Sequence, residues 1–294
     1  MNCSFAAANK VFQEQLKKTG AGFFDYYLLH GVDSENLSKY EKYGCFRWLL
    51  EKKEQGLVKH IGFSYHGDAE CLDGILPKHP EMEFVQLQIN YLDWESEWIQ
   101  SRRNHEVCVR HDKPIIVMEP VKGGSLACVP AEAEKLFRAA APDRSIPSWA
   151  IRFAASLPNV MVVLSGMSSM EQMEDNLSYM DNFVPLSEEE QKLCFQAGSI
   201  INAQIAVPCT GCSYCTEGCP AHIAIPRYFS LYNEIMREDM ERKGWTVSFS
   251  SYDTLAQTHG KASDCIACGQ CEEICPQRLP IIEHLKNVSA KFDH

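Results

Sequence analysis

The chain has 294 residues, enough for one large domain or for a medium domain joined to a small one. Its formal net charge of −11 argues against a nucleic-acid binder and against docking on an anionic membrane, because both need clustered Lys and Arg. The sequence contains no apolar run near the ~20 residues that a membrane span needs. The first fifteen residues lack the apolar core of a secretory signal. We therefore expect a cytoplasmic protein.

Short apolar runs that end in polar or glycine-containing turns recur along the first two hundred residues. They predict strands at residues 24–29, 60–65, 84–91, 114–118 and 160–165. Several of these runs are nearly continuous in apolar residues, which is typical of strands buried on both faces of a parallel sheet.

Helical patterns lie between these runs. Three of them cover residues 43–55, 131–140 and 148–155. Gly56 follows the first as a C-cap. Ser169 and Gln172 form a capping box that predicts the start of a fourth helix. This alternation of strands and helices indicates a parallel α/β sheet or barrel.

The five predicted strands begin between residues 24 and 160, which gives about 34 residues per strand–helix unit. An eight-unit barrel needs about 250 residues, so the region before Pro185 supplies only five units. Two architectures stay open: an open five-stranded sheet, or a barrel without its first three units. We expect one domain over residues 1–185 and a second over residues 186–294.

The chain has fourteen cysteines, and eight of them form two runs of the pattern C-x2-C-x2-C-x3-C-P, offset by 56 residues. The runs are Cys209, Cys212, Cys215 and Cys219, then Cys265, Cys268, Cys271 and Cys275. Without an export signal, such runs indicate metal binding and not disulfides. We expect the other six to be small buried hydrophobes: Cys3, Cys45, Cys71, Cys108, Cys128 and Cys194.

This spacing predicts two [4Fe–4S] clusters. Three thiolates at i, i+3 and i+6 can hold three corners of a cube, and the cysteine before proline ligates the other cluster. A structural zinc site uses paired cysteines and has no need of a third. The expected ligand sets are Cys209, Cys212, Cys215 and Cys275 for one cluster, and Cys265, Cys268, Cys271 and Cys219 for the other. Pro226 opens a predicted helix, so we expect a small, mostly α-helical domain.

Five motifs occur in order: YYLLH at 26–30, IGFS at 61–64, QLQINY at 86–91, PVKGG at 120–124, and SGMSS at 165–169 followed by Asn176. Together they resemble strands four to eight of the aldo/keto reductase family. With the cysteine runs, the chain resembles the subgroup that carries a C-terminal two-cluster ferredoxin domain. The resemblance implies a partial (β/α)8 TIM-type barrel of about five units, followed by a small helical ferredoxin-like domain.

The family uses an Asp–Tyr–Lys–His tetrad, and His30 matches its histidine, which orients the substrate carbonyl. The other three members belong to the family's second and third strands, which have no counterpart in this sequence. We expect Tyr26 and Tyr27 to pack within their strand and Lys39 to be a solvated loop charge.

The resemblance also implies contacts to NAD(P)(H): Ser64 and Gln88 at the nicotinamide carboxamide, Gly166 and Ser168 at phosphate, and Gln172 and Asn176 on the adenine side. Two positions depart from the family. Tyr65 replaces a common asparagine, and Met118 replaces the aromatic residue that stacks on the nicotinamide. NAD and NADP both stay open.

Two functions remain. The first is an iron–sulfur oxidoreductase acting on a small carbonyl or alcohol with NAD(P), together with a redox partner protein. The second is a non-catalytic electron-transfer or cofactor-binding module, because most of the tetrad has no counterpart here. A truncated gene product or an incomplete gene model is compatible with either.

Overall fold

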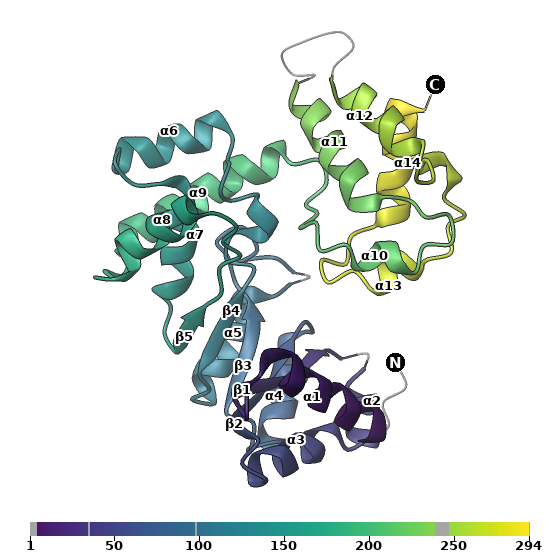
Figure 1. The fold of residues 1–294 in the computed structure, drawn as a ribbon. Helices are drawn as coiled ribbons and strands as arrows, with labels where there is room; N and C mark the ends of the chain where they lie inside the picture. The colour runs from purple at the N-terminus through teal and green to yellow at the C-terminus, as the bar shows by residue number, and fades with distance from the viewer. Residues whose placement is uncertain (1–4, 35, 98, 239–246, 294) are drawn as a thin grey trace. The chain divides into compact units, whose positions relative to one another are not determined.

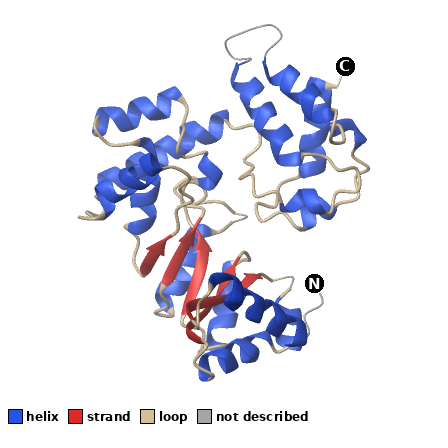
Figure 2. Ribbon diagram, viewed as in Figure 1, coloured by secondary structure: helices blue, strands red, loops and turns tan. Residues whose placement is uncertain are grey.

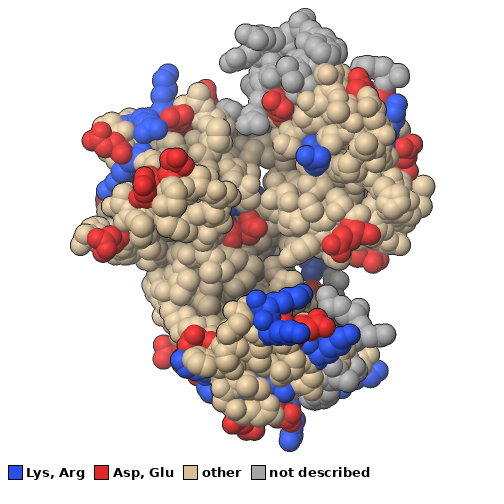
Figure 3. All heavy atoms as spheres, in the orientation of Figure 1, with Lys and Arg blue, Asp and Glu red and all other residues tan. Residues whose placement is uncertain are grey.

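A computed structural model describes residues 5–34, 36–97, 99–238 and 247–293 (Figure 1). The chain divides into two compact units. The sheet unit comprises Met1–Pro120 and Ser148–Gln191, and the cluster unit comprises Val121–Pro147 and Lys192–His294. None of the described helices is long and apolar enough to cross a membrane. On the face shown in Figure 3, Lys and Arg are interspersed with Asp and Glu.

Five parallel strands form one sheet in the order β1-β2-β3-β4-β5, which confirms the predicted α/β class (Figure 2). The strands are β1 (Phe24–Val32), β2 (Val58–Tyr65), β3 (Phe84–Gln88), β4 (Ile115–Met118) and β5 (Val160–Val163). β3 ends three residues earlier than predicted, because the Asn90 side chain accepts the backbone N–H groups of Leu92 and Asp93 and forms a turn.

Helices alternate with the strands of the sheet unit, and one helix precedes β1. They are α1 (Phe5–Thr19), α2 (Leu37–Lys42), α3 (Cys45–Glu54), α4 (Ala69–Lys78), α5 (Ser101–Arg110), α7 (Ile146–Ala155) and α8 (Met170–Met180). The long helix α9 (Glu188–Gln204) begins in the sheet unit, and most of its residues belong to the cluster unit. The prediction found α3, α7 and α8. Lys39 is exposed as expected, but it lies in α2 and not in a loop.

The prediction missed α5 because this helix turns polar side chains inward. Ser101, Asn104 and His105 are all buried, so the apolar repeat that marks a surface helix is absent. Several of their buried polar groups are bonded: Asn104 Nδ2 donates to the carbonyl of Gly67, and His105 Nε2 lies 2.9 Å from the carbonyl of Pro158. Asn104 Oδ1 is buried and accepts no hydrogen bond from the described residues.

The sheet is buried at its centre and exposed at its ends. β2, β3 and β4 are largely buried, as predicted, but Met161 and Val162 of β5 are 43% and 40% exposed. In the described part of the chain, β1 and β5 each pair with one neighbour only. The sheet curves so that Tyr26 Oη of β1 lies 4.0 Å from Met161 Sδ of β5.

Aromatic rings fill the inner face of the sheet at its amino end. Tyr26 stacks on His60 with ring centroids 4.8 Å apart and meets Phe84 edge-on at 5.6 Å. Gly62 is required beside them, because a Cβ there would collide with the carbonyl oxygen and ring of Phe84. This packing confirms that Tyr26 has a strand-packing role.

The cluster unit is helical in its described residues. It contains η1 (Lys122–Gly124), α6 (Ala131–Ala140), α10 (Tyr214–Glu217), α11 (Ile225–Glu238), α12 (Val247–Ala256), η2 (Ala262–Asp264), α13 (Gln270–Glu273) and α14 (Ile281–Phe292). Its core is built on stacked aromatic rings, such as Tyr252 on Phe292 with centroids 4.8 Å apart. The predicted small helical domain is thereby confirmed.

The scattered cysteines divide in burial. Cys108 and Cys194 are buried as predicted, while Cys45 and Cys71 are half-buried. Cys128 is exposed, so its predicted burial is wrong: it lies in a loop before α6 and not on an inward-facing element. Cys3 lies outside the described residues.

Candidate functional site

The predicted site residues of the first three strands lie at the carboxyl end of the sheet. Alternation along each strand puts Ser64 on the same face as His60, Gln88 on the same face as Phe84, and His30 on the same face as Tyr26. The aromatic packing at the amino end thus lies below these polar residues, on the inner face.

His30 is an exposed residue near the end of β1. Its backbone carbonyl accepts the Tyr40 hydroxyl at 2.6 Å, which fixes the strand end. A second imidazole, His66, lies close by and follows β2. Burial lowers the pKa of His66, and the nearby charge of His30 lowers it further. The sequence analysis missed His66, although it follows the predicted strand at 60–65 directly.

Ser64 is completely buried, and its hydroxyl oxygen accepts the backbone N–H of Gly31 at 2.7 Å. This bond ties the end of β1 to β2 and leaves the Ser64 hydroxyl proton free to be directed elsewhere. Tyr65 points to the opposite face, where its hydroxyl donates to the carbonyl of Asp68 at 2.7 Å. Tyr65 therefore does not substitute for the family's asparagine beside Ser64.

A buried carboxylate holds Gln88 in place. Asp93 Oδ2 accepts Gln88 Nε2 and Asn90 Nδ2, each at 2.9 Å. The backbone carbonyl of Gln88 accepts the Ser101 hydroxyl at 2.8 Å. The sequence analysis missed Asn90 and Asp93. The signal was available, since both polar residues follow a buried strand directly.

Met118 ends β4 and lies beside Gln86, whose Nε2 is 3.3 Å from Met118 Sδ. This contact gives the thioether a fixed neighbour on the inner face. A flexible thioether can cover an aromatic ring, although less rigidly than an aromatic side chain does.

The four remaining predicted residues lie after β5: Gly166 and Ser168 in the exposed loop that leads into α8, and Gln172 and Asn176 within α8 itself. Ser169 caps α8 by accepting the N–H of Gln172 at 3.4 Å. The capping box is altered, because the Gln172 side chain accepts the N–H of Ser168 at 2.6 Å and not that of Ser169. Asn176 donates to the hydroxyl of Ser165 at 3.0 Å. Gly166 is exposed, with open space around its Cα.

The cluster unit repeats itself at the offset found in the sequence. α10 and α13 occupy equivalent positions 56 residues apart, and so do the starts of α11 and α14. Backbones in the left-handed region also pair at this offset: Gly211 with Ala267, Ser213 with Gly269, and His222 with Arg278. The duplication therefore extends to local backbone conformation.

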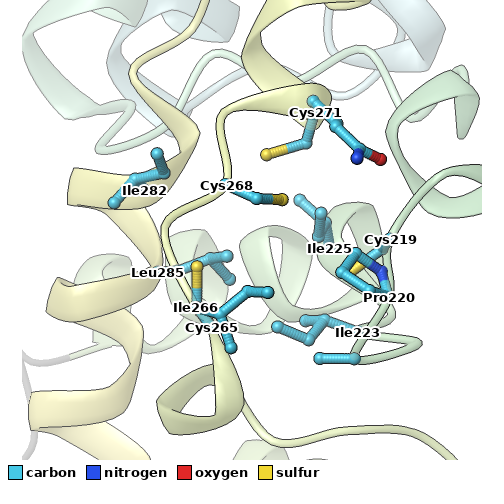
Figure 4. A pocket seen from close by; sticks show the side chains of 12 residues that line it. Cys219, Pro220, Ile223, Ile225, Cys265, Ile266, Cys268, Cys271, Ile282 and Leu285 are labelled. Carbon is cyan, nitrogen blue, oxygen red and sulfur yellow. The ribbon is translucent and has the colours of Figure 1, made fainter.

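Each half of this repeat contributes to two cavities. The first cavity is lined by Cys209, Cys212, Cys215 and Cys275. The second is lined by Cys265, Cys268, Cys271 and Cys219 (Figure 4). Three cysteines of one run and the last cysteine of the other run thus surround each cavity. Apolar side chains such as Ile225 line the remainder of both.

The eight thiols fit iron–sulfur cubes better than single ions. Among the described residues, no three His, Cys, Asp or Glu converge closely enough to hold one metal ion, while each cavity is ringed by four sulfurs. Burial raises the pKa of Cys209 and Cys271 to about 11 and that of Cys215 to about 12. The metal must therefore supply the free energy that keeps these ligands deprotonated. Gly211 N–H points at Cys209 Sγ, 3.4 Å away.

The structure thus combines a parallel sheet that has polar residues at its carboxyl end with a duplicated eight-cysteine unit. The aldo/keto reductase family model matches residues 4–197, and a 4Fe-4S dicluster domain model matches residues 208–279. The chain belongs to the aldo/keto reductase family and carries a dicluster domain that binds two [4Fe–4S] clusters.

Solved aldo/keto reductases share the fold at low identity. A Bacillus halodurans aldo-keto reductase in its holo form is 20% identical, covering 66% of this chain and 65% of that one, with a TM-score of 0.54. An enzyme from Brucella melitensis is 19% identical over 66% and 68% of the two chains, with a TM-score of 0.52. A Klebsiella pneumoniae enzyme in complex with NADP and acetate is 17% identical over 67% and 65%, with a TM-score of 0.52. The chain thus spans about two thirds of the length of these structures. A search of curated proteins found no match.

Proposed function

We propose that the sheet unit moves hydride between a nicotinamide dinucleotide and a small carbonyl or alcohol, while the clusters exchange electrons with a redox partner protein. One observation carries this proposal: His30, Ser64 and Gln88 lie on one face, at the carboxyl ends of three adjacent parallel strands. Barrel enzymes keep their chemistry at this end.

The residues have distinct roles in the proposal. His30, which is exposed at the strand end, orients the substrate carbonyl through its imidazole. Ser64 and Gln88 hold the nicotinamide carboxamide, and both are pre-positioned by hydrogen bonds to neighbouring residues. The dinucleotide, when bound, would supply two electrons as hydride, and solvent at the exposed end of β1 would supply the proton that completes the alcohol.

The charge around α8 favours NAD(H) over NADP(H). From Gly166 to Gln191 the sequence has no Lys or Arg, while Glu171, Glu174 and Asp175 lie in the first turns of the helix. A 2′-phosphate carries close to two negative charges, and dinucleotide sites accommodate it with a nearby arginine. In the proposal, the adenine-side contacts of Gln172 and Asn176 therefore serve NAD(H).

For the clusters, we assign Cys209, Cys212, Cys215 and Cys275 to the cube in the first cavity, and Cys265, Cys268, Cys271 and Cys219 to the cube in the second. The lining of the two cavities supports this crossed assignment. Each cube passes one electron, whereas nicotinamide passes two as hydride. The sequence shows no flavin signature that would bridge this difference, so the clusters take or give their electrons through a separate redox protein.

The test is an anaerobic assay of dinucleotide oxidation with small aldehydes. We expect turnover with NADH, slower turnover with NADPH, and loss of at least 100-fold in rate for His30→Ala, as for removal of a group that positions the reacting carbonyl. His111→Gln is the matched control, because His111 pairs with Asp73 on the helices outside the sheet.

Equal rates for His30→Ala and the unaltered protein would contradict the proposed chemistry. The second candidate, an electron carrier without hydride chemistry, is favoured by a sheet that has five strands in the described residues where the full barrel has eight. Protein that binds eight irons and is reduced by dithionite, but oxidises neither dinucleotide, would establish that candidate.

A further inference from the structure

The two cluster cavities are nearly equivalent, which makes their differences informative. Shifting the lining of the first cavity by 56 residues reproduces the second almost residue for residue. At equivalent positions, the first cavity has Gln277 where the second has Ala221, and Thr210 where the second has Ile266. Both differences make the first cavity more polar.

Lys122 approaches the first cavity through Gln277. Its Nζ donates to Gln277 Oε1 at 3.0 Å, and only 2% of Lys122 is exposed. Gln277 lines the first cavity together with Cys209 and Cys275. The ammonium group of Lys122 is therefore one hydrogen bond away from the lining of that cavity.

The backbone holds Lys122 in this position. Lys122 and Gly123 both have positive φ, 46° and 60°. A Cβ on residue 123 would collide with the carbonyl of Thr210, so only glycine permits this close approach to the first cysteine loop. The loop after β4 thus packs on the Cys209 segment within the cluster unit.

A negatively charged side chain lies beside the second cavity, in contrast to the positive charge of Lys122 beside the first. Glu272 directly follows Cys271, and its carboxylate accepts at 2.8 Å the N–H of Ile282, which lines the second cavity. Its equivalent in the first half is the neutral Thr216. Ile266 is 68% exposed, whereas the equivalent Thr210 is half-buried against Gly123.

We propose that Lys122 sets the reduction potentials of the two clusters apart and makes the cluster in the first cavity the easier one to reduce. Reduction adds a negative charge, which a buried cation stabilises and a neighbouring carboxylate opposes. An electron that enters at the second cavity therefore moves toward the first. The inference rests on the proposed cysteine assignment, but it does not depend on hydride transfer.

The test is an anaerobic redox titration of the whole protein with dithionite and mediators, followed by electron paramagnetic resonance. We expect two potentials. Lys122→Gln keeps a donor for Gln277 but removes the charge. We expect this variant to lower the equilibrium constant for reducing the higher-potential cluster at least tenfold, which corresponds to a potential lower by 59 mV for one electron. The equilibrium constant for reducing the other cluster should change less than threefold.

Three variants complete the design. Lys122→Arg keeps the charge and leaves both potentials in place, and Lys286→Gln removes an exposed charge from α14 with no effect on either. Glu272→Gln keeps an acceptor for the Ile282 N–H and raises only the lower potential. Equal shifts of both clusters in Lys122→Gln, or none, would overturn the proposal.

Iron and sulfide content are measured first, because fewer than eight irons would contradict the cysteine assignment and not the role of Lys122. If Lys122→Gln loses iron, Lys122→Arg and Glu272→Gln still decide the matter. A changed potential in Lys122→Arg, or a Glu272→Gln effect on the higher-potential cluster, would count against the proposal. Dithionite needs neither dinucleotide nor carbonyl, so inactivity in the aldehyde assay leaves this test intact.

Discussion

Asp93 orients two amides at the carboxyl end of β3. Its carboxylate is buried and accepts hydrogen bonds from both Gln88 and Asn90. A buried carboxylate that is fully bonded in this way keeps each amide in one orientation. Gln88 is therefore held in one orientation at the carboxyl end of β3, so that it would lose little side-chain entropy on binding a ligand.

Replacing Asp93 with alanine leaves both amide donors without this acceptor. We expect a loss of about 1–3 kcal/mol in the free energy of unfolding for each unsatisfied donor, together with weaker dinucleotide binding because Gln88 loses its fixed orientation. Urea unfolding and fluorescence titration with NADH measure the two effects. Asp143→Ala, at an exposed position, is the control. Unchanged NADH affinity in Asp93→Ala would show that Gln88 does not contact the cofactor.

Single residues were predictable where chemistry demands a fixed spacing. The eight cysteines and their period of 56 residues could be found from the sequence because a cube imposes that spacing on its ligands. The Lys122–Gln277 contact could not be found in this way, because it joins residues 155 positions apart and no local pattern records such a pair.

Helices and strands also differ in how well the sequence predicts them. Strands β2 and β4 were predicted within two residues, because continuous apolar runs mark strands that are buried on both faces. β3 was predicted too long, since the apolar run continues into a turn that the Asn90 side chain stabilises. α5 was missed because its inward-facing side chains are polar. Side-chain hydrogen bonds override the hydrophobic pattern in both cases: they are local at the end of β3 and long-range at α5.

At the level of elements, Gly62 tests how β2 and β3 pack. Gly62→Ala would bring a methyl group against the backbone and ring of Phe84, and overpacking of this kind costs about 1–3 kcal/mol of unfolding free energy. Gly74→Ala is the matched control, because Gly74 lies within α4 and a methyl group there would meet open space. Alanine in a helix should raise the free energy of unfolding by about 0.5–1 kcal/mol relative to glycine. Chemical denaturation checks both signs, and a neutral Gly62→Ala would refute the packing described for the inner face.

The whole molecule combines two units that derive stability from different sources. The sheet unit has a large apolar core that includes Trp149 and Phe153, whereas the core of the cluster unit lies beside two cavities lined with thiols. Metal binding is coupled to folding wherever the ligands are brought together only in the folded state. The cluster unit should therefore depend on iron, and the sheet unit should not.

Removing the iron under oxidising conditions with a chelator tests this dependence. Burial raises the pKa of Cys209 and Cys215 well above neutrality, so the thiols become protonated and the links that they make through the clusters are lost. We expect the helical signal in circular dichroism to fall and to melt earlier. Trp48 and Trp149 are buried in the sheet unit, and with Trp245→Phe their fluorescence reports on that unit and should keep its transition. If fluorescence and circular dichroism instead shift together in one transition, the two units fold as one and the iron stabilises both.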